Sequence, residues 1–259
     1  MTFSLIWLPD VLKNADLKVS LVAGWQTRGR ADMGLLQGVI CHHTGTARNG
    51  NMPSLDTLIN GRSDLPGPLA QLGLGRDGTY YVIAAGKCNH AGAGSWQGNT
   101  FGNTCFIGIE AENGGKITDI WPDIQMDAYH RGVAAILKHI GKGAEFCAGH
   151  KEYALPKDRK PDPLFDMDVF RSEVSKILDG KAPAPQLIPA IEASGIKRPT
   201  LRRGASGELV KQLQAKIGAV SDGIFGPKTE SAVRDFQRKN NLVPDGIVGP
   251  KSWAILDTN

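Results

Sequence analysis

The stretch Gly38-Val-Ile-Cys-His-His-Thr44 predicts a buried β-strand that ends in polar residues with functional side chains. Its first half is apolar and contains β-branched side chains, and the turn residue Gly45 follows it. Because side chains alternate between the two faces of a strand, His42 and His43 point in opposite directions. Only one of them therefore faces a given site, and this stretch alone leaves the choice open.

A second segment combines a histidine with a rigidly held carboxylate. His150 stands near its start, and Asp162 follows twelve residues later between Pro161 and Pro163. The two prolines restrict the backbone around the carboxylate and remove N–H donors, which is typical of a stiff loop. Metal ligands need such fixed geometry, so the segment indicates a metal site; an ordinary surface turn is the alternative.

A third stretch, Thr104 to Glu112, predicts another strand with one apolar face. Alternation puts Glu110 and Glu112 together on the opposite face. A carboxylate can take a proton from water and return it to a leaving amine, as amide hydrolysis requires. Both glutamates are candidates for this role, and Glu112 also fits a solvated position at the strand end.

Length and composition favour two soluble globular modules. The chain has 259 residues, of which 41% are hydrophobic and 22% charged. A net charge of +4 without a long Lys/Arg run favours an anionic surface such as a cell wall over nucleic acid.

No apolar run reaches the roughly 18–20 residues of a membrane span. The first twenty residues lack a signal-peptide pattern, so we expect synthesis in the cytoplasm. The four cysteines form no CxxC pair and are expected to be free thiols.

A proline-rich segment divides the chain. We predict a first module at 1–178, an extended linker at 179–199 and a second module at 200–259. Within the second module, the run from Asp222 to Thr229 recurs from Asp245 to Ser252 as Asp-Gly-Ile-x-Gly-Pro-Lys-x. In each copy an Asp-Gly turn precedes a proline that suits the first position of a helix. Apolar residues at helical spacing around these turns predict three short helices with one small core.

This second module resembles the peptidoglycan-binding type 1 domain, a three-helix cell-wall anchor. The likeness covers nearly all of residues 201–256 and includes both Asp-Gly-x-x-Gly turns, Ala232-Val233…Phe236-Gln237 and Trp253…Leu256. It implies that the protein binds peptidoglycan. Phe236 and Trp253 are expected in the core of the module.

The first module resembles the type 2 N-acetylmuramoyl-L-alanine amidases. The likeness rests on His-His-Thr after a strand and on Gly-His-x-Glu…Lys-x-Asp-Pro, and it runs from about Gly38 to Phe170. It implies an α/β fold of the amidase and peptidoglycan-recognition type, with a mixed β-sheet flanked by helices. It also implies hydrolysis of the amide bond between N-acetylmuramic acid and L-alanine of the peptidoglycan stem peptide.

The same resemblance implies the roles of individual residues. One Zn²⁺ per chain is expected on three ligands: His42, His150 and Asp162. Two nitrogen ligands and one oxygen ligand leave a fourth position open, which is typical of a catalytic rather than a structural zinc site. Glu110 matches the family's acid/base, Lys160 is expected to stabilise the developing oxyanion, and His90 is expected to contact substrate, with a structural histidine as the alternative.

One departure from the family pattern concerns a tyrosine. Some members carry a catalytic Tyr on the strand before the Arg-Asp-Gly turn, but residues 66–74 contain none. This difference favours a mechanism that depends on Glu110.

Taken together, these motifs predict a monomeric lytic enzyme with a wall anchor, such as a phage endolysin released through a holin. The alternatives are a non-catalytic peptidoglycan-recognition protein, a bacterial autolysin and a cytosolic amidase that recycles soluble muropeptides.

Overall fold

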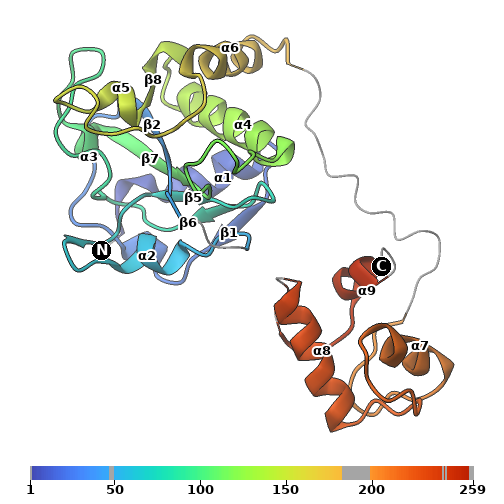
Figure 1. Ribbon diagram of the computed structural model, residues 1–259. Coiled ribbons are helices and arrows are strands. Elements are labelled where there is room, and N and C mark those ends of the chain that lie inside the picture. Colours follow the sequence, from blue (N-terminus) through green and yellow to red (C-terminus); the bar gives the residue numbers. More distant parts are fainter. Residues whose placement is uncertain (1, 47–49, 183–198, 241, 243, 257–259) are drawn as a thin grey trace. The chain divides into compact units, whose positions relative to one another are not determined.

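The computed structural model describes residues 2–46, 50–182, 199–240, 242 and 244–256. They belong to two compact units, one within Met1–Gln186 and one within Leu187–Asn259 (Figure 1). Each unit has its own hydrophobic core, as expected of a separate domain. Most of the predicted linker, 183–198, lies outside the described residues.

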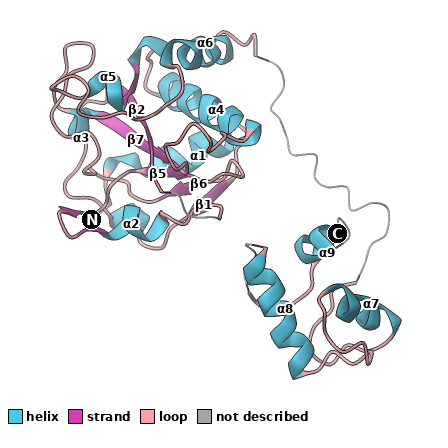
Figure 2. Ribbon diagram, viewed as in Figure 1, coloured by secondary structure: helices cyan, strands magenta, loops and turns pink. Residues whose placement is uncertain are grey.

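The first unit is built on a six-stranded sheet with the order β1-β6-β5-β7-β2-β8. Figure 2 shows the strands in magenta. All neighbouring strands in it are parallel except β5 and β6. Its strands are β1 (Val19–Leu21), β2 (Gly38–His43), β5 (Leu72–Leu74), β6 (Tyr80–Val82), β7 (Phe106–Ala111) and β8 (Cys147–Gly149), and β3 (Gly61–Arg62) pairs with β4 (Leu65–Pro66) in a separate hairpin. The predicted mixed sheet is confirmed, and β2 lies between β7 and the edge strand β8.

Helices cover one face of this sheet. The helices of the first unit are α1 (Leu8–Lys13), α2 (Leu55–Asn60), α3 (Gly102–Cys105), α4 (Asp123–His139), α5 (His150–Tyr153) and α6 (Met167–Leu178), with 3₁₀ turns at Ser4–Trp7, Trp25–Thr27 and Ala144–Phe146. α1, α4 and α6 share one core with alternate residues of β2 and β7. Val39 and Cys41 of β2 belong to this core, whereas Ile40 packs with a separate cluster on the other face. His42 therefore points away from the long helices.

The second unit consists of α7 (Glu208–Lys216), α8 (Pro227–Lys239) and α9 (Pro250–Leu256) around a small core. The core contains Val210, Val233 and Trp253, as the helical spacing predicted, whereas Phe236 is only partly buried and packs against it. The predicted three-helix arrangement is confirmed.

The two copies of the repeat in this unit make the same hydrogen bonds. In the first copy the side chain of Gln214 donates to the Asp222 carboxylate (2.7 Å) and accepts from the backbone N–H of Gly223 (2.8 Å). In the second copy Gln237 does the same with Asp245 (2.7 Å) and Gly246 (2.8 Å). Both glycines have positive φ, 77° and 75°, which only glycine adopts without strain. Each Asp-Gly turn is thus fixed by one buried glutamine from the preceding helix.

Two predictions made from composition can be compared with the structure. Among the described residues, no helix is long and apolar enough to cross a membrane. All four cysteines are free thiols, and three of them are fully buried: Cys41, Cys88 and Cys147.

Candidate metal centre

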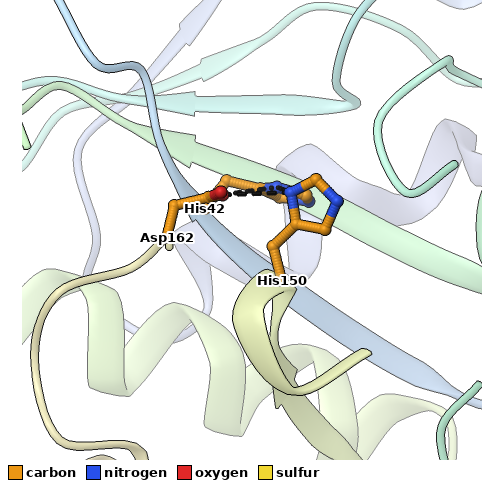
Figure 3. A group of neighbouring side chains, drawn as sticks. All are labelled: His42, His150 and Asp162. Atoms are coloured by element: carbon orange, nitrogen blue, oxygen red, sulfur yellow. Dashed lines mark hydrogen bonds and ion pairs between the residues drawn. The ribbon is translucent and has the colours of Figure 1, made fainter. Parts of the chain in front are cut away.

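Three side chains from separate parts of the first unit meet at one point (Figure 3). His42 comes from the end of β2, His150 from the first turn of α5 directly after β8, and Asp162 from the loop before α6. The Nδ1 atoms of the two histidines lie 3.0 Å apart, and the Oδ2 atom of Asp162 lies 3.2 Å from one and 3.1 Å from the other. The pairing of β2 with β8 brings the two histidines together.

The spacing of these atoms fits a metal ion. Ligands held at 2.0–2.1 Å from a tetrahedral zinc ion lie roughly 3.3 Å from one another, close to the separations seen here. All three side chains are buried, with residue exposures of 1% for His42, 3% for His150 and 8% for Asp162. Burial, followed by the neighbouring His150, lowers the pKa of His42 to about 4, so its ring is neutral at pH 7. A bound cation would balance the carboxylate of Asp162.

The tautomer of His150 also suits metal binding. Its Nε2 atom lies 3.0 Å from the backbone carbonyl oxygen of Ala91. A carbonyl oxygen only accepts hydrogen bonds, so Nε2 carries the ring proton and Nδ1 presents a lone pair to the cluster. Zinc-binding histidines usually donate their second ring nitrogen to a carbonyl or carboxylate in this way.

Glu110 lies beside the cluster on the neighbouring strand. The parallel register of β2 and β7 pairs it with His42, and its Oε1 atom is 3.9 Å from His42 Nδ1. Its Oε2 atom is buried and has no hydrogen-bond partner among the described residues. Burial and then the negative charge of Asp162 raise the pKa of Glu110 to about 8. A carboxyl group with a raised pKa facing a metal site is suited to proton transfer.

Glu112 occupies a different environment, and its predicted solvated position is wrong. The residue is fully buried. Its carboxylate accepts hydrogen bonds from the Ser54 backbone N–H (3.0 Å), the Ser54 hydroxyl (3.1 Å) and the Thr44 hydroxyl (2.9 Å). These bonds tie the ends of two strands to the segment before α2, which is a structural role.

The remaining predicted residues surround the cluster. Lys160 is partly buried, and its positive charge acts to lower the pKa of both His42 and Glu110. His43 lies outside the cluster, with its ring 6.5 Å from that of Trp121. His90 is buried, and its two ring nitrogens contact His42 and a backbone carbonyl. Any contact of His90 with substrate would have to involve its carbon edge, and that contact stays a prediction.

Tyr129 of α4 reaches the site although its sequence pattern gave no sign of it. Helical spacing of apolar residues predicts an amphipathic helix from about Met126 to Ile140 and identifies Tyr129 only as part of its apolar stripe. In the structure its hydroxyl accepts a hydrogen bond from the backbone N–H of His42 (3.0 Å) and lies 3.0 Å from the carbonyl oxygen of Ile109. The hydroxyl therefore bridges β2 and β7 directly behind His42.

Comparison with known families gives two matches along the chain. Residues 33–164 match the family described as N-acetylmuramoyl-L-alanine amidase, and residues 206–256 match a peptidoglycan binding domain. The first match contains all of the residues placed at the cluster. Both resemblances inferred from the sequence are confirmed. No curated protein matches the chain.

Several solved structures are similar to parts of the chain. The endolysin of Burkholderia phage AP3 is 40% identical over 23% of this chain and 25% of its own, with a TM-score of 0.23. A fused Zn-dependent amidase/peptidase/peptidoglycan-binding protein of Clostridium acetobutylicum is 39% identical over 24% of this chain and 30% of its own, with a TM-score of 0.23. An AmpD derivative is 24% identical over 67% of this chain and 99% of its own, with a TM-score of 0.47. The match thus spans about a quarter of the endolysin.

Proposed function

Because the chain belongs to the N-acetylmuramoyl-L-alanine amidase family, we propose that it is a zinc enzyme that cuts the bond between N-acetylmuramic acid and the L-alanine of the stem peptide. The observation that carries this proposal is the convergence of His42, His150 and Asp162 beside Glu110, within the residues that match the family. A recognition protein without catalytic activity would need neither the ligand set nor the adjacent carboxyl group.

Each residue of the centre has a distinct part in this proposal. His42, His150 and Asp162 hold Zn²⁺, which when bound supplies Lewis acidity toward the amide carbonyl and the attacking water. Glu110 takes the proton of that water and passes it to the leaving amine of L-alanine. The positive charge of Lys160 stabilises the negative charge that develops on the carbonyl oxygen. With Zn²⁺ bound nearby, the pKa of Glu110 would fall below its raised value of about 8, so that the carboxylate could act as a base at neutral pH.

The test of this function is mass spectrometry of purified peptidoglycan after digestion. We expect free stem peptides that begin with L-alanine, together with intact glycan strands. A chelator should stop the reaction, and added Zn²⁺ should restore it. New reducing sugar ends would instead identify a glycosidase and refute the proposal.

We further propose that the second unit anchors the enzyme to the cell wall and that the whole protein acts as a phage endolysin. It would then be made in the host cytoplasm and reach the wall through a holin. The match of residues 206–256 to a peptidoglycan binding domain supports the anchor. A bacterial autolysin would use the same two units, whereas a recycling amidase for soluble muropeptides has no use for a wall anchor.

Removing the anchor should separate wall attachment from catalysis. A protein of residues 1–178 is expected to cleave soluble muropeptides at the full rate but to degrade intact sacculi about tenfold or more slowly at low enzyme concentration, because tethering raises the local concentration of enzyme. Turbidity loss of sacculi and release of peptide from soluble muropeptides measure the two activities. Equal rates on sacculi for the short and full-length proteins would contradict the assignment of an anchor.

A further inference from the structure

The position of His90 is fixed by several independent contacts. Its backbone N–H and that of Ala91 both donate to the side-chain oxygen of Asn103, at 2.9 and 2.7 Å. The ring lies over Gly108 of β7, where an added Cβ atom would come within 2.6 Å of the imidazole. The absence of a side chain at this strand position thus makes room for the ring of His90.

These contacts determine where the protons lie on two neighbouring imidazoles. The Nε2 atom of His90 is 3.2 Å from the carbonyl oxygen of Phe106, which only accepts, so this nitrogen carries the proton. The Nδ1 atom of His90 is therefore an acceptor, and it lies 3.1 Å from Nε2 of His42. His42 must donate through Nε2, which leaves its Nδ1 atom with a lone pair directed at His150 and Asp162.

We propose that His90 is a positioning residue that holds His42 in the Nε2–H tautomer and aims its Nδ1 atom at the metal. Its neighbour Ala91 does the same for His150 through the backbone carbonyl. The two adjacent residues therefore orient both histidine ligands, one at the end of β2 and the other in the first turn of α5. This inference rests on the proposed zinc centre, but it concerns metal binding and not the identity of the substrate.

The test compares metal binding and tautomer in two variants of His90. His90→Ala removes the acceptor, and His90→Asn retains a carbonyl oxygen near the position of Nδ1. We expect His90→Ala to weaken Zn²⁺ binding about 10- to 100-fold, the range typical for lost hydrogen-bond partners of metal ligands, and His90→Asn to recover part of this loss. Competition with a chromophoric chelator measures the affinity. Long-range ¹H–¹⁵N NMR of the protein stripped of metal should show His42 protonated at Nε2 in the wild type and a mixture of tautomers in His90→Ala.

His130→Ala serves as the control, because His130 packs against Phe170 at 4.5 Å outside the metal centre. It should leave zinc affinity and the His42 tautomer unchanged. A wild-type His42 protonated at Nδ1, or an unchanged zinc affinity in a folded His90→Ala protein, would overturn the inference. A raised KM with unchanged zinc affinity would show that His90 contacts substrate instead. Because zinc binding is measured apart from hydrolysis, a failure of the proposed amidase activity would be seen separately.

Discussion

A Glu110→Gln protein will keep one zinc ion per chain and lose amidase activity by about 10²- to 10⁴-fold, the usual contribution of a general acid–base. The substitution keeps the shape of the side chain but removes its ability to exchange a proton. Glu110 lies 3.9 Å from His42 Nδ1 without being one of the three mutually adjacent ligand atoms, so the metal should remain. Release of L-alanine-terminated peptides and zinc content measured on the same preparation test both halves of this expectation.

Glu112→Gln is the matched control, since it changes the other glutamate on the same face. Glu112 is buried and bonded to Ser54 and Thr44, so its replacement should lower the free energy of unfolding by about 1–3 kcal/mol. The folded fraction should retain its zinc and its activity. If Glu112→Gln were inactive while folded and Glu110→Gln were active, the assignment of the base would have to be exchanged.

In protein stripped of metal, the raised pKa of Glu110 makes the free energy of unfolding depend on pH. The unfolded carboxyl group ionises near pH 4.5, whereas the folded one does so near pH 8. Between these values the unfolded state binds fewer protons than the folded state, so stability falls as pH rises. Wild type should lose up to about 1.4 kcal/mol per pH unit relative to Glu110→Gln over this interval. Urea unfolding of both proteins at several pH values measures the difference, and parallel stability curves would contradict it.

Replacing a metal ligand is expected to have the second large effect. His42→Ala, His150→Ala and Asp162→Ala should each abolish stoichiometric zinc binding and all measurable hydrolysis. Each substitution removes one of three ligand atoms that lie within 3.2 Å of one another. Two protein ligands bind a zinc ion too weakly to retain it. Elemental analysis of the purified variants provides the measurement.

His43→Ala is the control for His42→Ala because the two histidines are neighbours in sequence. His43 lies outside the ligand cluster, so its replacement should leave zinc bound. The opposite result, with zinc retained in His42→Ala and lost in His43→Ala, would reverse the choice of ligand.

Strand alternation and family register identified much of the centre from the sequence. Both rules apply because Gly38–His43 and Phe106–Ala111 are regular parallel neighbours, so residues that share a face in sequence also share it in space. The predicted helix at about 126–140 begins slightly earlier, at Asp123, since Pro122 in extended conformation precedes its first turn. The environments of Glu112 and His90 were not predictable in the same way. They depend on Ser54 and on the carbonyl of Phe106, which loops bring close without any periodic signal in the chain.

The wide separation of the ligands along the chain has a thermodynamic consequence. Position 42 and position 162 are 120 residues apart, so an ion bound between them acts as a reversible cross-link over most of the first unit. A ligand that binds only the folded chain stabilises it by about 2.7 kcal/mol at a hundredfold excess over its Kd. Loss of the proposed zinc ion, through scarcity or through a chelator in the storage buffer, is therefore expected to make the protein more sensitive to proteases and also to stop hydrolysis.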